Sequence, residues 1–208
     1  MFAAIFWDND GVLMETEHLY YRANAEALAR AGVELTLDTF RELSLRRGES
    51  VLQLAAAGEQ DLRPWRDRRY RELLSEEAEV IPGVDETLAR LYGSLPMAVV
   101  TSCRRENFLH MHRNSRLLDY FDFILTREDY GNSKPDPEPY LLACARAGHA
   151  PTNCLAVEDS ERGVTAAARA GLTVVAVPGP LNRGGDFSAA RWELESIVRL
   201  PDLVEIGR

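Results

Sequence analysis

Two aspartates follow directly on an apolar run near the start of the chain. The run from Phe2 to Trp7 ends in Asp8, and Asp10 and Gly11 come next. Because successive side chains of an extended backbone point to opposite sides, positions 8 and 10 share a side. Two ionised carboxylates that close repel each other, so one of them tends to hold a proton. The pair suits a cation ligand beside a proton donor, although two solvated loop charges would give the same residues.

Three later segments carry further polar groups that could do chemistry. Thr101 and Ser102 follow one apolar run, Glu158 and Asp159 end another, and Lys134 precedes a proline-rich turn. Hydroxyls and a lysine ammonium can donate to phosphate oxygens, and paired carboxylates offer the hard oxygen ligands that Mg²⁺ prefers. The alternatives are ordinary strand ends, a surface charge and an acidic helix start. Lys134 is the only lysine among 24 basic residues, which favours a role that the planar fork of arginine does not fill.

The apolar runs are short and nearly continuous, which is typical of parallel strands covered on both faces. We expect strands over 3–7, 97–100, 121–125, 154–157 and 173–177, with helical patterns between them. This alternation predicts an α/β fold with a doubly wound parallel sheet and a Rossmann-like core. In such sheets ligands bind beyond the carboxyl ends of the strands, where all four polar segments fall.

Residues 15–79 interrupt this alternation and show no strand signal. Helices are expected over 17–31, 37–43, 51–57 and 64–78. We therefore predict a helical cap domain over 15–79 and a catalytic core built from 1–14 and 80–208. The segment after Gly179 looks loop-like, with 182–186 exposed.

The bulk composition limits the partners of the chain. The net charge of −9 argues against nucleic acid and anionic membranes, and no apolar run approaches the ~20 residues of a membrane helix. Three cysteines without metal-type spacing, and no secretory signal pattern, predict a cytoplasmic protein with reduced thiols. A monomer is the default expectation. The basic stretch 63–74, with interleaved aromatics, is interpreted as a solvated helix face rather than a nucleic-acid site.

Taken together, the motifs resemble those of the haloacid dehalogenase superfamily, in the branch of phosphoglycolate phosphatase and β-phosphoglucomutase with a helical cap. The resemblance covers nearly the whole chain. It rests on Asp8-x-Asp10-Gly11-Val12-Leu13, Thr101-Ser102, Lys134-Pro135-x-Pro137-x-x-Tyr140 and Glu158-Asp159-Ser160, followed by Gly163, Ala166, Ala167 and Ala170-Gly171.

The resemblance implies a role for each core residue. Asp8 would attack phosphorus and form an aspartyl-phosphate, and Asp10 would protonate the leaving oxygen and then activate water. Thr101 and Lys134 would hold phosphate oxygens. Mg²⁺ would be held by Asp8, the backbone carbonyl of Asp10 and Asp159, with Glu158 nearby or ligating. The flanking residues Trp7 and Asn9 are expected to point away from the site and to leave the chemistry unchanged.

The implied function is hydrolysis of a small phosphorylated metabolite such as a sugar phosphate. The cap loop 45–50 is the leading candidate for substrate recognition, through Arg46, Arg47 and Gly48, with Ser102, Glu17 and Arg104 as further candidates. A hexose-phosphate mutase is the enzyme alternative. It is disfavoured because the cap has no lysine and because Tyr20 stands where that branch aligns a histidine. A phospho-receiver signalling domain is the non-enzyme alternative, and the helical cap argues against it.

Overall fold

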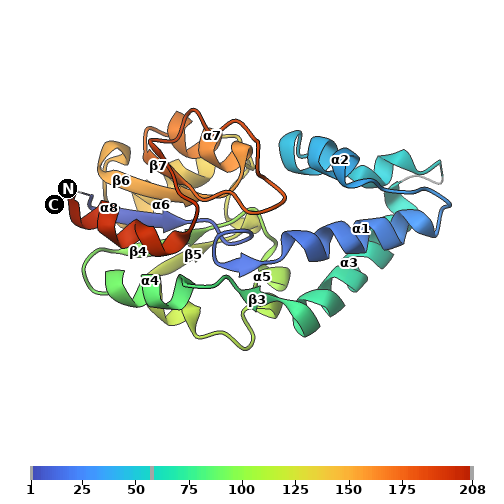
Figure 1. Cartoon of the computed structure of the whole chain (residues 1–208), viewed down its shortest axis with the longest axis horizontal. Helices are drawn as coiled ribbons and strands as arrows, with labels where there is room; N and C mark the ends of the chain where they lie inside the picture. The colour runs from blue at the N-terminus through green and yellow to red at the C-terminus, as the bar shows by residue number, and fades with distance from the viewer. Residues whose placement is uncertain (1, 57–58, 207–208) are drawn as a thin grey trace.

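The core of the molecule is a six-stranded, entirely parallel sheet with strand order β5-β4-β1-β6-β7-β8 (Figure 1). A computed structural model describes residues 2–56 and 59–206. The strands are β1 (Ala4–Trp7), β4 (Met97–Val100), β5 (Phe123–Leu125), β6 (Cys154–Glu158), β7 (Thr173–Ala176) and β8 (Trp192–Glu193). This architecture confirms the predicted α/β fold with a parallel sheet. The continuous apolar runs arise because both faces of the sheet are covered.

Successive residues of each strand supply two separate cores. On β1, Ile5 and Trp7 pack into one apolar cluster, and Phe6 packs into the other. Helices α4 (Val84–Leu91), α5 (Arg105–Met111) and α8 (Leu200–Ile206) belong to the first side. Helices α6 (Glu138–Ala147) and α7 (Glu161–Arg169) cover the second. The short 3₁₀ turns between them are η3 (Leu117–Tyr120), η4 (Arg127–Asp129), η5 (Pro151–Asn153) and η6 (Ile197–Arg199).

A group of helices lies beyond the end of the sheet that is opposite the two termini (Figure 1). It comprises α1 (Glu17–Ala29), α2 (Leu37–Phe40), the π-helix η1 (Arg41–Arg46), the 3₁₀ helix η2 (Val51–Leu54) and α3 (Glu59–Glu77). The helix expected over 51–57 is only a 3₁₀ turn, and position 57 lies outside the described residues. A cluster including Leu28, Phe40 and Leu52 gives the group its own apolar core.

Two very short strands join these helices to the sheet. β2 (Met14–Glu15) pairs antiparallel with β3 (Glu79–Val80). Two-residue strands carry no detectable alternation, so the sequence did not predict them. The insert thus begins and ends at one place, with both crossings of the chain side by side.

The prediction of a loop-like segment after Gly179 is wrong for its second half. Strand β8, the turn η6 and helix α8 lie there, and Ile197, Leu200 and Val204 are buried against the α4 side of the sheet. The apolar positions are few and separated by charged residues, which hid the helical period. Among the described residues, no helix is both long and apolar enough to cross a membrane.

The contact between β6 and α7 depends on a glycine, and we expect its substitution to destabilise the protein. A Cβ at Gly163 would lie 1.8 Å from Glu158 Oε2, which is buried at the end of β6. We expect Gly163→Ala to lower the free energy of unfolding by about 1–3 kcal/mol, because overpacking outweighs the helix preference for alanine. Urea denaturation followed by circular dichroism measures it.

Gly131→Ala is the matched control. Its Cβ would meet the Glu138 carboxylate at 3.4 Å, an ordinary contact. A Gly163→Ala protein as stable as the wild type would contradict the close approach of β6 and α7.

Candidate functional site

A buried lysine lies at the centre of the strand ends. Lys134 is 4% exposed, and its Nζ donates to Asp8 Oδ1 at 2.9 Å and to the Val100 carbonyl at 2.8 Å. The same Nζ lies 2.6 Å from Glu158 Oε1, which also accepts a hydrogen bond from the Tyr140 hydroxyl. Burial works to lower the pKa of Lys134, but the Asp8 and Glu158 carboxylates outweigh it and hold that pKa well above its usual value. The site therefore contains one fixed positive charge.

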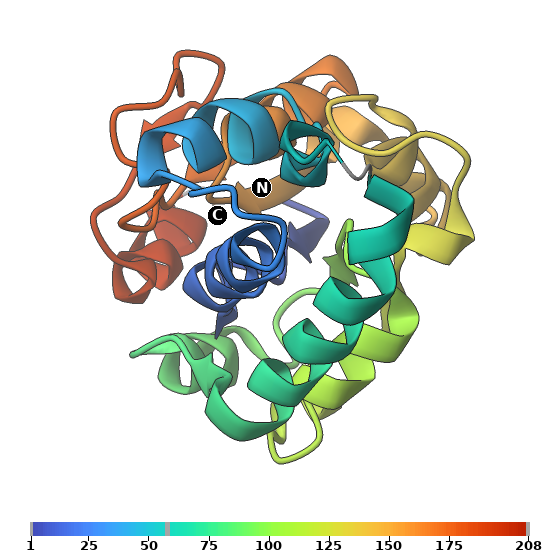
Figure 2. The same cartoon turned by 90° about the vertical axis from the view of Figure 1, so that its right-hand side faces the viewer.

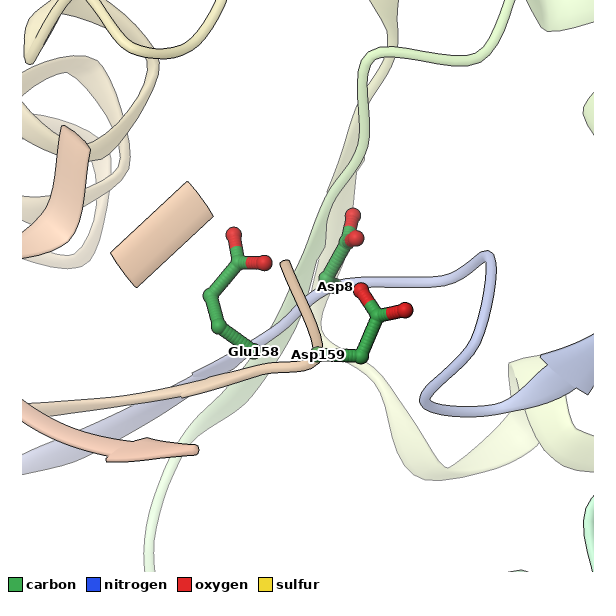
Figure 3. Close-up of side chains that lie close together, drawn as sticks. All are labelled: Asp8, Glu158 and Asp159. Carbon is green, nitrogen blue, oxygen red and sulfur yellow. The ribbon is translucent and has the colours of Figure 1, made fainter. Parts of the chain in front are cut away.

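Three carboxyl groups meet beside this lysine (Figure 3). Asp8, Glu158 and Asp159 are buried, and each offers an oxygen within 4.8 Å of the others. Burial, with the neighbouring Glu17, Asp8 and Glu158 charges, raises the pKa of Asp159 well above its usual value. Gly11, with φ +78°, makes room for Asp159, because a Cβ there would lie 2.0 Å from Asp159 Oδ2.

The donor set of this cluster fits a hard divalent cation such as Mg²⁺. All its ligand atoms are carboxylate oxygens, and the acids outnumber the single ammonium beside them. Glu158 Oε1 is already occupied by Lys134 and Tyr140. Asp8 and Asp159 are therefore the better placed protein ligands, with Glu158 behind them.

Asp10 lies next to the cluster at the mouth of the cavity. The Thr16 hydroxyl donates to Asp10 Oδ1 at 2.5 Å, and the Thr101 hydroxyl lies 3.5 Å from Oδ2. Burial raises the pKa of Asp10, the Thr16 hydrogen bond opposes this, and the charge of Asp8 adds to the rise. Asp10 consequently holds a proton more readily than a solvated aspartate.

The side chain of Asn9 takes part in the surroundings of Asp10. Asn9 is fully buried, its Nδ2 lies 3.3 Å from Asp10 Oδ2, and its Oδ1 lies 2.7 Å from His112 Nε2. The other ring nitrogen of His112, Nδ1, lies 2.8 Å from Ser115 Oγ. Asn9 does not line the cavity, in keeping with a side chain that points away from it, but it contacts the carboxyl group of Asp10. Burial lowers the pKa of His112 to about 4, so this imidazole is neutral near pH 7.

A cavity of about 450 Å³ lies between the strand ends and the helices α1, α2 and α3. Most of the predicted site residues line it, namely Asp8, Asp10, Glu17, Gly48, Thr101, Ser102, Arg104, Lys134 and Asp159. Glu158 lies behind them, fully buried. The structure thus brings four separate sequence motifs to one cavity.

Besides Glu158, the predicted site residues Arg46 and Arg47 do not line this cavity. Both are about half exposed and pair with Glu42, at 3.4 Å and 2.8 Å. Arg46 also reaches Glu161 on α7, at 3.3 Å. The cavity lining therefore gives no support to the substrate-binding role expected for Arg46 and Arg47. Both arginines thus have acidic partners outside the cavity, Glu42 of the π-helix and, for Arg46, also Glu161.

Three arginines of α3, rather than Arg46 and Arg47, line the cavity. They are Arg63, Arg66 and Arg71, and Tyr20 and Tyr70 lie beside them on the cavity wall. The interpretation of 63–74 as a solvated face is wrong for Arg66, which is 5% exposed and donates to the Tyr20 hydroxyl at 2.6 Å. The signal was present in the sequence, because positions 63, 66, 70 and 71 share one helix face.

Asn182 is a second residue that the sequence did not reveal. Its amide donates to Glu17 Oε1 at 2.9 Å and to Asp159 Oδ2 at 2.7 Å. Burial raises the pKa of Glu17 to about 7, the Asn182 hydrogen bond opposes this, and the charges of Asp10 and Asp8 add to it. Figure 2 shows the loop after β7 beside α2, and Arg41 Nε donates to the Leu181 carbonyl at 3.1 Å. This loop therefore contacts the helical insert, while Arg183, Gly184 and Asp186 are exposed as expected.

The chain belongs to the haloacid dehalogenase-like hydrolase family, whose model matches residues 5–177. Protein CbbY of Rhodobacter capsulatus is 32% identical, over 96% of this chain and 93% of its own length. A phosphorylated carbohydrates phosphatase of Thermotoga maritima is 34% identical, over 81% of this chain and 82% of its own. The protein is an enzyme of the phosphoric monoester hydrolase class.

Solved structures agree with this assignment. A mutant of CbbY from Rhodobacter sphaeroides, in complex with xylulose-1,5-bisphosphate, superposes with a TM-score of 0.83 at 28% identity. The match covers 96% of both chains. The helical insert as well as the sheet is therefore shared with a protein that holds a phosphorylated sugar.

The neutral, buried His112 makes stability depend on pH. Its pKa is about 4 when folded and about 6.5 in an unfolded chain, so the unfolded state binds more protons between these values. Stability should therefore fall as pH falls from 6.5 to 4, by up to about 3 kcal/mol from this group at about 1.4 kcal/mol per unit. We expect His112→Gln to remove most of the loss of stability that His112 causes on acidification, as measured by urea unfolding at pH 7 and pH 4.5.

His149→Gln, in the turn after α6, controls for the loss of one imidazole. A His112→Gln protein that loses as much stability on acidification as the wild type would show that His112 is protonated in the fold.

Proposed function

We propose that the protein is a Mg²⁺-dependent phosphatase of small phosphorylated metabolites that works through an aspartyl-phosphate. One observation carries this proposal. The Asp8 carboxylate belongs to the carboxylate cluster and accepts a hydrogen bond from the Lys134 ammonium, with Asp10 beside it at the same cavity. A nucleophile, a proton donor, a fixed cation and a metal-type oxygen set are the groups that phosphoryl transfer to a carboxylate needs.

In the proposed first step, an Asp8 oxygen attacks phosphorus and the bond from phosphorus to the leaving oxygen breaks. Asp10 gives its proton to that leaving oxygen. In the second step Asp10, now ionised, takes a proton from water, and the water oxygen attacks the same phosphorus. Inorganic phosphate leaves and Asp8 is restored. The raised pKa of Asp10 supports its role as general acid in the first step and as general base in the second.

Charge repulsion is the obstacle in this reaction, because a carboxylate must approach a phosphate dianion. Lys134 offsets part of this repulsion, and Thr101 supplies a hydroxyl at the same strand end. Asp8, Asp159 and the Asp10 carbonyl would hold Mg²⁺, with Glu158 as a further carboxylate. The metal would supply positive charge at the phosphate oxygens.

We propose a sugar phosphate with a second anionic group as the substrate class. Two observations support it: the arginines of α3 on the cavity wall, and the bisphosphate bound by the CbbY structure. The hexose-phosphate mutase alternative is disfavoured because the helical insert of this chain has no lysine; the sole lysine is Lys134 of the core.

We also propose that residues 15–79 act as a cap domain on the 1–14 and 80–208 core. We propose that the protein works as a monomer in the cytoplasm, where its three free cysteines stay reduced.

Turnover of p-nitrophenyl phosphate tests the proposed chemistry. We expect steady release of phosphate with Mg²⁺ and none after chelation. Asp8→Asn should abolish turnover because the nucleophile is lost, and Asp10→Asn should lower kcat/KM for an alkyl phosphate by roughly 10²–10⁴-fold. Metal-independent activity, or an active Asp8→Asn protein, would refute the mechanism.

A second test concerns the cap arginines. Arg71 lines the cavity, and its Nε lies 3.5 Å from Glu106 Oε1. The variant Arg71→Gln removes its charge. We expect kcat/KM for the best sugar bisphosphate of a substrate panel to fall about 10-fold, because a charged hydrogen bond is lost. Turnover of p-nitrophenyl phosphate should stay within about twofold of the wild type.

Arg69→Gln is the matched control, since Arg69 lies on the same helix and pairs with Glu26 at 2.7 Å. Equal losses on both substrates would argue against a second anion site at Arg71.

A further inference from the structure

We propose that Asn9 and His112 are positioning residues that fix the Asp10 carboxyl group for proton transfer. This inference rests on the proposed role of Asp10 as the general acid. It starts from an unbroken series of contacts, from Ser115 through His112 and Asn9 to Asp10. None of these three partners lines the catalytic cavity, so they act on the substrate only through Asp10.

The direction of each hydrogen bond follows from its neighbour. The Met111 thioether accepts only, and it lies 2.8 Å from the same Asn9 atom that faces Asp10 Oδ2 at 3.3 Å, so this atom is the Nδ2 donor. The Asn9 oxygen then faces His112, so His112 carries its hydrogen on Nε2 and donates to Oδ1 across 2.7 Å. His112 Nδ1 is left to accept from the Ser115 hydroxyl at 2.8 Å. One tautomer of His112 therefore selects one orientation of the Asn9 amide.

Burial makes this selection effective. Asn9 is fully buried and His112 is 4% exposed, so water does not compete for either side chain. A buried amide without partners is costly, and an apolar side chain would fill this place beside Met111 of α5 without that cost. Packing alone therefore does not explain the polar side chains of Ser115, His112 and Asn9. Asp10 is the residue that connects them to the cavity.

The consequence concerns the plane of the Asp10 carboxyl group. Rotation about the terminal bond of an aspartate is soft, and the Thr16 hydroxyl holds only Oδ1. The Asn9 amide holds Oδ2, which fixes the plane and leaves the remaining lone pairs directed at the cavity. A general acid works only within hydrogen-bond reach of the leaving oxygen, so loss of this second hold should weaken protonation of the leaving group.

Two substrates separate this role from a purely structural one. p-Nitrophenolate departs without a proton, whereas phenolate gains much from one. Since kcat/KM covers the steps up to aspartyl-phosphate formation, its ratio for p-nitrophenyl phosphate and phenyl phosphate reports proton donation. We expect Asn9→Leu and His112→Leu to lower kcat/KM for phenyl phosphate about 10-fold more than for p-nitrophenyl phosphate, in the direction of Asp10→Asn.

Conservative variants complete the experiment. His112→Gln retains an N–H donor for Asn9 and should recover most of the wild-type ratio. Ser115→Ala removes one hydroxyl from a partly buried position, leaves the core packing intact and should shift the ratio by about 2-fold in the same direction. If the leucine variants do not fold, the substrate ratio of Ser115→Ala alone decides whether the positioning role holds. His149→Gln serves again as the control histidine.

The outcomes separate the inference from the proposed function. Equal losses on both substrates, or an unchanged ratio in Ser115→Ala and the leucine variants, would overturn the positioning role while phosphatase activity stood. A His112→Gln protein as defective as His112→Leu would also overturn it. Absence of turnover in the wild type would overturn the proposed function, and the inference with it.

Discussion

The site is organised by the balance between several buried carboxyl groups and one buried ammonium. Lys134 contacts Asp8, Glu158 and the Val100 carbonyl, and through them it ties together the ends of β1, β4 and β6. Without it, these acids would repel one another or take up protons. One ammonium does not balance the whole set, and the remaining negative charge suits the divalent cation that we propose for this cavity.

The parallel sheet makes this concentration of charge possible. Strands that run in one direction release their last side chains at one edge, so short segments far apart in sequence meet there. The two glycines beside the cluster show how closely these segments approach, since Gly11 and Gly163 leave no room for a Cβ next to Asp159 and Glu158. The fold therefore supplies proximity, and the residue types at the strand ends supply the chemistry.

The sequence allowed the fold and the inner site to be predicted, because each core motif directly follows a continuous apolar run. The outer wall was predicted less well. The Gly-containing loop favours Arg46 and Arg47 as substrate ligands, but both pair with Glu42 of the π-helix that ends at Arg46. No local pattern indicates Asn182 and His112, because their partners, Glu17, Asp159 and Asn9, are more than 20 residues away in sequence. Such pairings depend on how the chain folds back, which local patterns do not encode.

A buried apolar cluster joins Leu73 and Leu74 of α3 to Trp7 of the sheet, and polar pairs add to this contact between the helical insert and the core. They include Arg46 with Glu161, Arg71 with Glu106 and Arg41 with the Leu181 carbonyl. Pairs of this kind contribute about 0–1 kcal/mol each and weaken with ionic strength. Salt therefore weakens the polar pairs but not the apolar cluster, so the helical insert stays packed on the sheet when its outer ion pairs are screened.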